Sequence, residues 1–89
     1  MVEREVEIVN RLGLHARAAA RLVHVAGGFA SHVTLAAGPE EVNAKSILGL
    51  LLMAATQGSQ VRVRCEGADE EAALATVVDL IADGFGEES

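Results

Sequence analysis

The sequence has almost no aromatic residues, with two Phe and neither Trp nor Tyr among its 89 residues. It also contains a single cysteine, Cys65, and a single proline, Pro39. One cysteine excludes an intrachain disulfide and any metal or redox site built on paired cysteines. No apolar run is long enough to cross a bilayer, and the N-terminus lacks the layout of a signal peptide. We therefore expect a soluble cytoplasmic protein without a metal or cofactor.

Positive charge is also scarce, because 7 Lys and Arg stand against 13 Asp and Glu, for a net charge of -6. Binding to a phosphate backbone needs a basic surface, and binding to single strands uses aromatic side chains for stacking. The composition therefore argues against a nucleic-acid partner. The hydrophobic share of 51% comes mainly from Ala, Val, Leu and Ile, and the length suits one small domain.

The pattern of apolar and polar residues predicts seven elements. Alternation predicts strands at 2–9, 32–37, 40–43 and 60–66. Helical spacing predicts helices at 16–26, at 47–55 and from 70 to near 84. Ser46 and Asp69 are candidate N-caps of the second and third helix. This βαββαβα order favours an α+β fold in which helices cover one face of an antiparallel sheet.

His15 lies at the start of the first expected helix, and Arg17 follows two residues later. Free N–H groups and the positive end of the helix dipole make this position a site for anions such as phosphate. The dipole also disfavours imidazolium, so a neutral ring can attack a phosphoryl donor. The N–H groups of Ala16 and Arg17, with the Arg17 guanidinium, would then hold the phosphate of a phosphohistidine. From spacing alone, a solvated histidine without function is the alternative.

Two blocks of sequence stand out, GLHARAAARLV at 13–23 and VNAKSILGLLL at 42–52. Together they resemble the HPr family, the histidine-containing phosphocarriers of the phosphoenolpyruvate-dependent sugar phosphotransferase system. The resemblance covers about residues 1–86 and includes the order of the elements. It implies a single domain with an open-faced β-sandwich fold, a four-stranded antiparallel sheet with three helices on one face. Residues 87–89 would form a short, solvated acidic tail.

The resemblance implies a role for each matching residue. His15 would accept a phosphoryl group on Nδ1 from phospho-enzyme I and pass it to an enzyme IIA domain, with Arg17 beside the phosphate. Ser46 would match the serine that HPr kinase/phosphorylase modifies in some lineages, although a plain capping role worth about 1 kcal/mol is compatible. The partner-docking residues would be Ala20, Leu48, Gly49 and Leu51. A monomer suits such a diffusing carrier.

Two residues depart from the usual family pattern. Ala18 stands where relatives usually have Pro, so it restores an N–H donor to the phosphate cradle and gives up the preset φ of proline. Leu12 stands where many relatives carry Ser, Thr or Asn. The segments NRLGLHARAA and DGFGEES also resemble NPr, the nitrogen-related paralogue, which leaves a regulatory phosphotransferase chain open beside the sugar branch.

Two other classes of function remain as alternatives. A small α+β binding module would need sheet-face or pocket chemistry, for which the sequence offers neither aromatics nor a metal motif. An enzyme that turns over a free substrate would need several catalytic partners, and an 89-residue domain has little room for such a pocket. A carrier needs only an exposed site that two larger proteins can reach.

The apolar segment 47–55 has too many large side chains for one buried helix face. Spacing predicts a division, with Ile47, Leu50 and Ala54 inward and with Leu48, Leu51 and Leu52 more exposed. An exposed apolar group near His15 would be a docking surface. The alternative is that the whole group is buried against the sheet.

Overall fold

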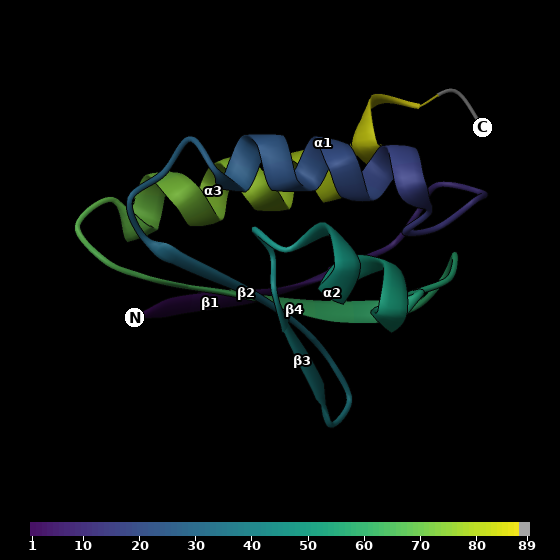
Figure 1. Ribbon diagram of the computed structural model, residues 1–89, viewed down its shortest axis with the longest axis horizontal. Helices are drawn as coiled ribbons and strands as arrows, with labels where there is room; N and C mark the ends of the chain where they lie inside the picture. Colours follow the sequence, from purple (N-terminus) through teal and green to yellow (C-terminus); the bar gives the residue numbers. More distant parts are fainter. Residues whose placement is uncertain (88–89) are drawn as a thin grey trace.

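The computed structural model describes residues 1–87, and its elements follow the expected βαββαβα order (Figure 1). The strands are β1 (Val2–Glu7), β2 (His32–Ala37), β3 (Glu40–Asn43) and β4 (Gln60–Glu66). The helices are α1 (Ala16–Ala26), α2 (Ile47–Met53) and α3 (Glu70–Ala82), followed by a 3-10 turn, η1 (Gly84–Gly86). Within residues 1–87, no helix combines the length and the apolar character that crossing a membrane requires.

The four strands form one sheet in the order β1-β4-β2-β3, and every neighbouring pair is antiparallel. Figure 1 shows α1 and α3 side by side along one face of this sheet, with α2 packed against α1 and β3. The opposite face is charged, and Arg64 of β4 pairs there with Glu3 and Glu41. The predicted four-stranded antiparallel sheet with three helices is therefore confirmed.

The core follows the predicted periodicities. Along β4, Val61, Val63 and Cys65 are buried while the residues between them are not, because side chains alternate across a strand. The buried face of α3 contains Leu74, Val77, Val78 and Ile81, as the spacing predicts, together with Ala73. Burial raises the pKa of the Cys65 thiol, and the nearby Glu70 and Asp69 carboxylates raise it further. The thiol is therefore part of the hydrophobic core.

Two predicted boundaries are too long. The strand predicted at 2–9 is β1, which ends at Glu7. The Ile8 N–H still donates to the Ser59 carbonyl at 2.9 Å. The helix predicted at 47–55 ends at Met53, because Ala54 adopts a left-handed backbone with φ 50°. That turn lets the Ala55 carbonyl accept the Leu14 N–H at 2.8 Å, which ties the end of α2 to the segment before α1.

Asp69 occupies the N-cap position of α3, as predicted, and its carbonyl accepts the Ala73 N–H at 2.9 Å. Its side chain, however, makes no capping hydrogen bond. Its carboxylate instead accepts the Ala30 and Ser31 N–H groups, each at 2.9 Å, and the Ser31 hydroxyl. At the same helix end, the Glu70 carboxylate accepts the Gly67 N–H at 3.1 Å. The Asp69 carboxylate therefore bonds to the segment before β2 and not to the amides of its own helix.

This network predicts how stability depends on acid pH. The Ser31 hydroxyl, followed by the Ala30 N–H, holds the pKa of Asp69 below its ordinary value of 3.8. A carboxyl whose pKa is lower in the folded state stabilises the fold above the unfolded pKa, and this contribution is lost as the pH falls through the folded pKa. We therefore expect the stability difference between the wild type and Asp69→Asn to shrink between about pH 5 and pH 2. Urea unfolding over that range measures it, and a constant difference would contradict the prediction.

Candidate functional site

His15 is the N-cap of α1, and its ring joins the first turn of the helix. Nδ1 accepts the Arg17 N–H at 3.3 Å, and the His15 carbonyl accepts the Ala19 N–H at 2.8 Å. The preceding Gly13 has φ +65°, and its carbonyl accepts the His15 N–H at 3.0 Å. Because Nδ1 is an acceptor, its lone pair is directed toward the Arg17 N–H in the first turn of α1.

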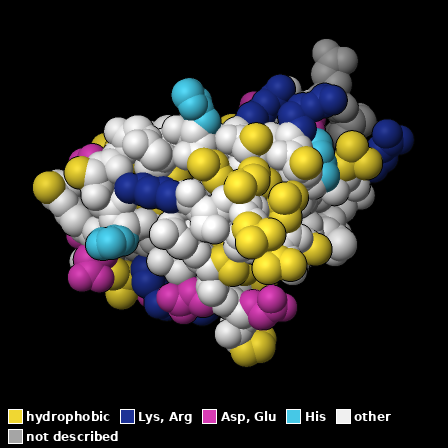
Figure 2. Space-filling model, in the orientation of Figure 1, with side chains coloured by type: hydrophobic (Ala, Val, Ile, Leu, Met, Phe, Trp, Pro, Cys, Tyr) yellow, Lys and Arg dark blue, Asp and Glu magenta, His cyan; other side chains and the backbone are white. Residues whose placement is uncertain are grey.

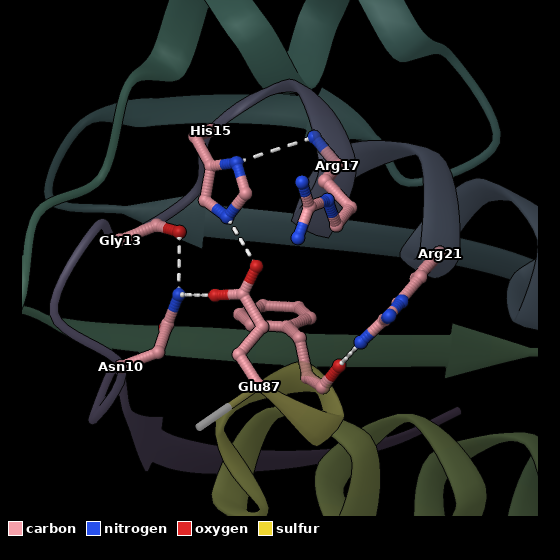
Figure 3. Close-up of polar contacts among 7 residues, drawn as sticks. Asn10, Gly13, His15, Arg17, Arg21 and Glu87 are labelled. Atoms are coloured by element: carbon pink, nitrogen blue, oxygen red, sulfur yellow. Dashed lines mark hydrogen bonds and ion pairs between the residues drawn. The ribbon is translucent and has the colours of Figure 1, made fainter. Parts of the chain in front are cut away.

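The other ring nitrogen of His15 contacts a carboxylate from the far end of the chain (Figure 3). Nε2 lies 2.5 Å from Oε2 of Glu87, whose Oε1 accepts a hydrogen bond from Asn10 Nδ2 at 2.8 Å. The same Nδ2 donates to the Gly13 carbonyl at 2.8 Å. Both partners of Asn10 are acceptors, so its amide nitrogen must face them. The polar contacts thus connect His15, Glu87, Asn10 and Gly13.

The interpretation of residue 87 as part of a solvated tail is wrong. The Glu87 side chain is only 10% exposed, against 25% for His15. Burial acts to raise the pKa of Glu87, but the hydrogen bonds from Asn10 and His15 and the charge of Arg17 outweigh it and lower the pKa. Glu87 is therefore a carboxylate at neutral pH. Residues 88 and 89 of the predicted tail lie outside the described residues.

The segment η1 brings Glu87 to this position. Phe85 is fully buried in the core, and its carbonyl accepts a hydrogen bond from the Arg21 guanidinium of α1. Its backbone is left-handed at φ 60°, between Gly84 and Gly86, which also have positive φ. A buried anchor and three left-handed residues turn the chain from the end of α3 toward the start of α1, as Figure 1 shows.

The sequence-predicted phosphate cradle lies at one end of α1. Ala16 and Arg17 are exposed and Ala18 is buried. The Ala19 N–H makes the first i→i−4 hydrogen bond of α1, to the His15 carbonyl. The N–H groups of the three residues before it have no such partner within the helix. Figure 3 shows the Arg17 side chain beside the imidazole, on the side of Glu87. His15, Arg17 and the cradle amides are thus brought together.

Ser46 is the N-cap of α2, as predicted. Its Oγ accepts the Gly49 N–H at 3.2 Å, and its carbonyl accepts the Leu50 N–H at 3.1 Å. The side chain is half-buried, and Gly49 is half-buried beside it. The hydroxyl therefore has a structural partner in the unmodified chain.

An apolar surface covers α2 and extends toward His15. We define the apolar patch by its most exposed large side chains, Leu12, Ile47, Leu48, Leu51 and Leu52. Figure 2 shows hydrophobic side chains gathered on this face, with cationic side chains above them. The prediction that Ile47 and Ala54 point inward is wrong, because Ile47 is 41% exposed and Ala54 is exposed as well. The inward position predicted for Leu50 is confirmed, and Met53 is the other residue of α2 in the core.

The predicted docking residues fall on this face of the protein. Leu48 and Leu51 belong to the apolar patch, Gly49 lies between them in α2, and Ala20 is exposed on α1. α1 and α2 pack against each other. The predicted set is thus presented by two contacting helices, one of which begins at His15.

The sequence that forms this site belongs to a known family of proteins. Residues 2–83 match the family model described as "PTS HPr component phosphorylation site". The chain belongs to the HPr family. It is 46% identical to the phosphocarrier protein HPr of Xylella fastidiosa over 89 residues, which is 100% of each chain.

Solved HPr structures agree with this assignment. The HPr of Thermoanaerobacter tengcongensis superimposes with a TM-score of 0.95 at 45% identity, covering 100% of each chain. A second structure from that organism, described as an HPr dimer, has a TM-score of 0.78 at 45% identity and covers 98% of this chain and 100% of its own. The predicted family and its open-faced β-sandwich fold are confirmed.

Sequence reasoning missed Glu87 and Asn10 as neighbours of His15. Neither residue has a periodic or local relation to the histidine, and Glu87 is separated from it by 72 positions. The available signal was Phe85, a large apolar residue among glycines after the last predicted helix. Such a residue indicates that the chain returns to the core, because a solvated tail gains nothing from it.

Proposed function

We propose that this chain accepts a phosphoryl group on Nδ1 of His15 from phospho-enzyme I, charged by phosphoenolpyruvate, and passes it to an enzyme IIA domain. The observation that supports this most strongly is the Nδ1 lone pair directed at the Arg17 N–H in the first turn of α1. A phosphoryl group on Nδ1 would meet the N–H groups of Ala16, Arg17 and Ala18, which carry the positive end of the helix dipole. The Arg17 guanidinium would supply a counter-charge.

The proposed partners are enzyme I and enzyme IIA domains, and both would dock on the same face. Ala20, Leu48, Gly49 and Leu51 provide the apolar part of that face, next to the phosphorylated ring. The chain would act in the cytoplasm. It would act there as a monomer, because a docked partner and a second copy would compete for the apolar patch. Two solved relatives are described as dimers, so the oligomeric state of this chain is tested by its mass in solution.

Intact mass after incubation with phosphoenolpyruvate and enzyme I tests the transfer. The wild type should gain one acid-labile phosphoryl group, and His15→Ala should gain none. His24→Ala is the matched control, because His24 is exposed on the same helix, and it should gain the group at the wild-type rate. If the wild type gains none from an enzyme I active on another carrier, the proposal is overturned in favour of a dedicated donor, as in an NPr-type regulatory chain.

Regulation at Ser46 by HPr kinase/phosphorylase forms part of the proposal. A phosphate on Oγ would remain at the start of α2, where the helix dipole favours it. It would also add negative charge beside Leu48 and weaken docking of a partner with an acidic rim. Ser46→Asp should therefore raise the KM for enzyme I, whereas Ser46→Ala should not. Equal KM values in both variants would refute this part of the proposal.

A further inference from the structure

The contact between His15 and Glu87 gives the two ring nitrogens different roles. Nδ1 faces a donor, the Arg17 N–H, and Nε2 faces an acceptor, the Glu87 carboxylate at 2.5 Å. A neutral imidazole carries one proton, and only the tautomer with hydrogen on Nε2 satisfies both contacts. The hydrogen bond made by one nitrogen of a histidine decides which state the other adopts. Glu87 therefore stabilises the tautomer in which Nδ1 is free to react.

The carboxylate itself is held in place on two sides. Asn10, which is 1% exposed, donates to Oε1, so Oε2 remains for the histidine. The backbone before Glu87 is fixed by the buried Phe85 ring and by the Arg21 contact to the Phe85 carbonyl. Glu87 thus holds the ring from a fixed position in the fold, as Figure 3 shows.

We infer that Glu87 is a positioning residue for phosphoryl transfer at His15, an inference that rests on the proposed function. The Nδ1 lone pair forms the bond to phosphorus, while the bond from phosphorus to the donor atom of phospho-enzyme I breaks and its electron pair stays with the donor. The proton on Nε2 does not leave, so the phosphorylated ring becomes an imidazolium. The Glu87 carboxylate faces this new positive charge directly, as the carboxylate of a Ser-His-Asp triad does.

The same contact favours transfer onward. When an enzyme IIA domain takes the phosphoryl group, the electron pair of the breaking bond returns to Nδ1, and the ring leaves as a neutral imidazole with its Nε2 proton in place. No proton has to move in either direction. A ring that lost the Nε2 proton while phosphorylated would be a poorer leaving group, because it would depart as an anion. Glu87 keeps the proton on Nε2 through the whole cycle.

The experiment compares the wild type, Glu87→Ala and a matched control, Glu71→Ala. Glu71 is exposed in the first turn of α3, at the end of that helix remote from His15, so the control removes the same charge elsewhere. Phosphorylation by enzyme I is followed over a range of carrier concentrations. We expect Glu87→Ala to lower the maximal rate about tenfold, as for the loss of one hydrogen bond to a charged group, with less than about a twofold change in KM. The control should match the wild type.

A second measurement needs no phosphorylation. In proton NMR spectra of the wild type, the His15 Nε2–H should give a resonance shifted downfield and protected from solvent exchange, as expected for a proton bound to a carboxylate. Glu87→Ala should lose this resonance while keeping its backbone amide signals, and those signals would show that the fold is retained. If that variant unfolds, the protected resonance of the wild type still decides whether the contact exists.

The outcomes separate this inference from the function on which it rests. If all three proteins are phosphorylated at equal maximal rates, or Glu87→Ala is faster, the role of Glu87 is overturned and the carrier function stands. A rate loss that appears only as a higher KM would show Glu87 to be a docking residue and would also overturn it. A wild type that accepts no phosphoryl group overturns the carrier function, and the positioning role with it.

Discussion

Phe85→Ala is expected to lower the free energy of unfolding by about 3–5 kcal/mol, the range for removing a buried aromatic side chain. Phe85 is the largest fully buried side chain of the described chain, with 0% exposure. Its ring fills space between α3, which precedes it, and α1, whose Arg21 binds its carbonyl. Because α3 and α1 are packed helices, they limit how far the cavity left by alanine can close.

Guanidinium unfolding of the variant and of Phe29→Ala measures this effect. Phe29 is the other phenylalanine, and it is only partly buried at the edge of the core, so its replacement should cost clearly less. Phe85→Ala should also loosen the contact between Glu87 and His15, since the anchor of that segment is lost. Similar losses of stability in the two variants would contradict the role given to Phe85.

Gly13→Ala is expected to have the second largest effect, because two costs add at one position. The backbone of Gly13 has φ +65°, which costs a residue with a Cβ about 1–2 kcal/mol. A Cβ there would also lie 2.5 Å from the Ala55 carbonyl oxygen, the acceptor of the Leu14 N–H. Overpacking of this kind costs about 1–3 kcal/mol more. The shift would also move His15, two residues away, and slow its phosphorylation.

Gly38→Ala is the matched control for Gly13→Ala. Gly38 has nearly the same φ, +58°, and an added Cβ would meet nothing within 4 Å. Thermal or urea unfolding should therefore show only the backbone cost in this control, with no change in the rate of phosphorylation. Equal destabilisation of the two variants would mean that the chain around Ala55 yields to the new methyl group.

Local sequence patterns were sufficient to predict the helices and strands of the fold. They also predicted the position of His15 at a helix start, but not the contacts on the other side of its ring. The alternation of Val61, Val63 and Cys65 predicts β4, and the position of His15 at a helix start predicts its place among free amides. Ser46 caps α2 for the same local reason. Each of these features depends on residues a few positions apart, whose geometry is set by the period of a strand or helix.

The errors arose where a residue had a local and a distant partner available. Asp69 could cap its own helix, but the N–H groups of Ala30 and Ser31 lie within reach in the fold. Ile47 has the spacing of an inward residue, yet α2 is only seven residues long and buries Leu50 and Met53 instead. The spacing of apolar residues predicts which side chains share a face of a helix. It does not predict how much of that face is covered by another element.

The sequence by itself determined the α+β architecture, the histidine at the start of α1 and the family to which the chain belongs. Only the tertiary structure decided what lies on the far side of the imidazole. Glu87 and His15 are joined across 72 positions by the packing of Phe85, the turn of η1 and the amide of Asn10. Such a contact has no period along the chain, because it depends on where three separate segments end after the core has formed.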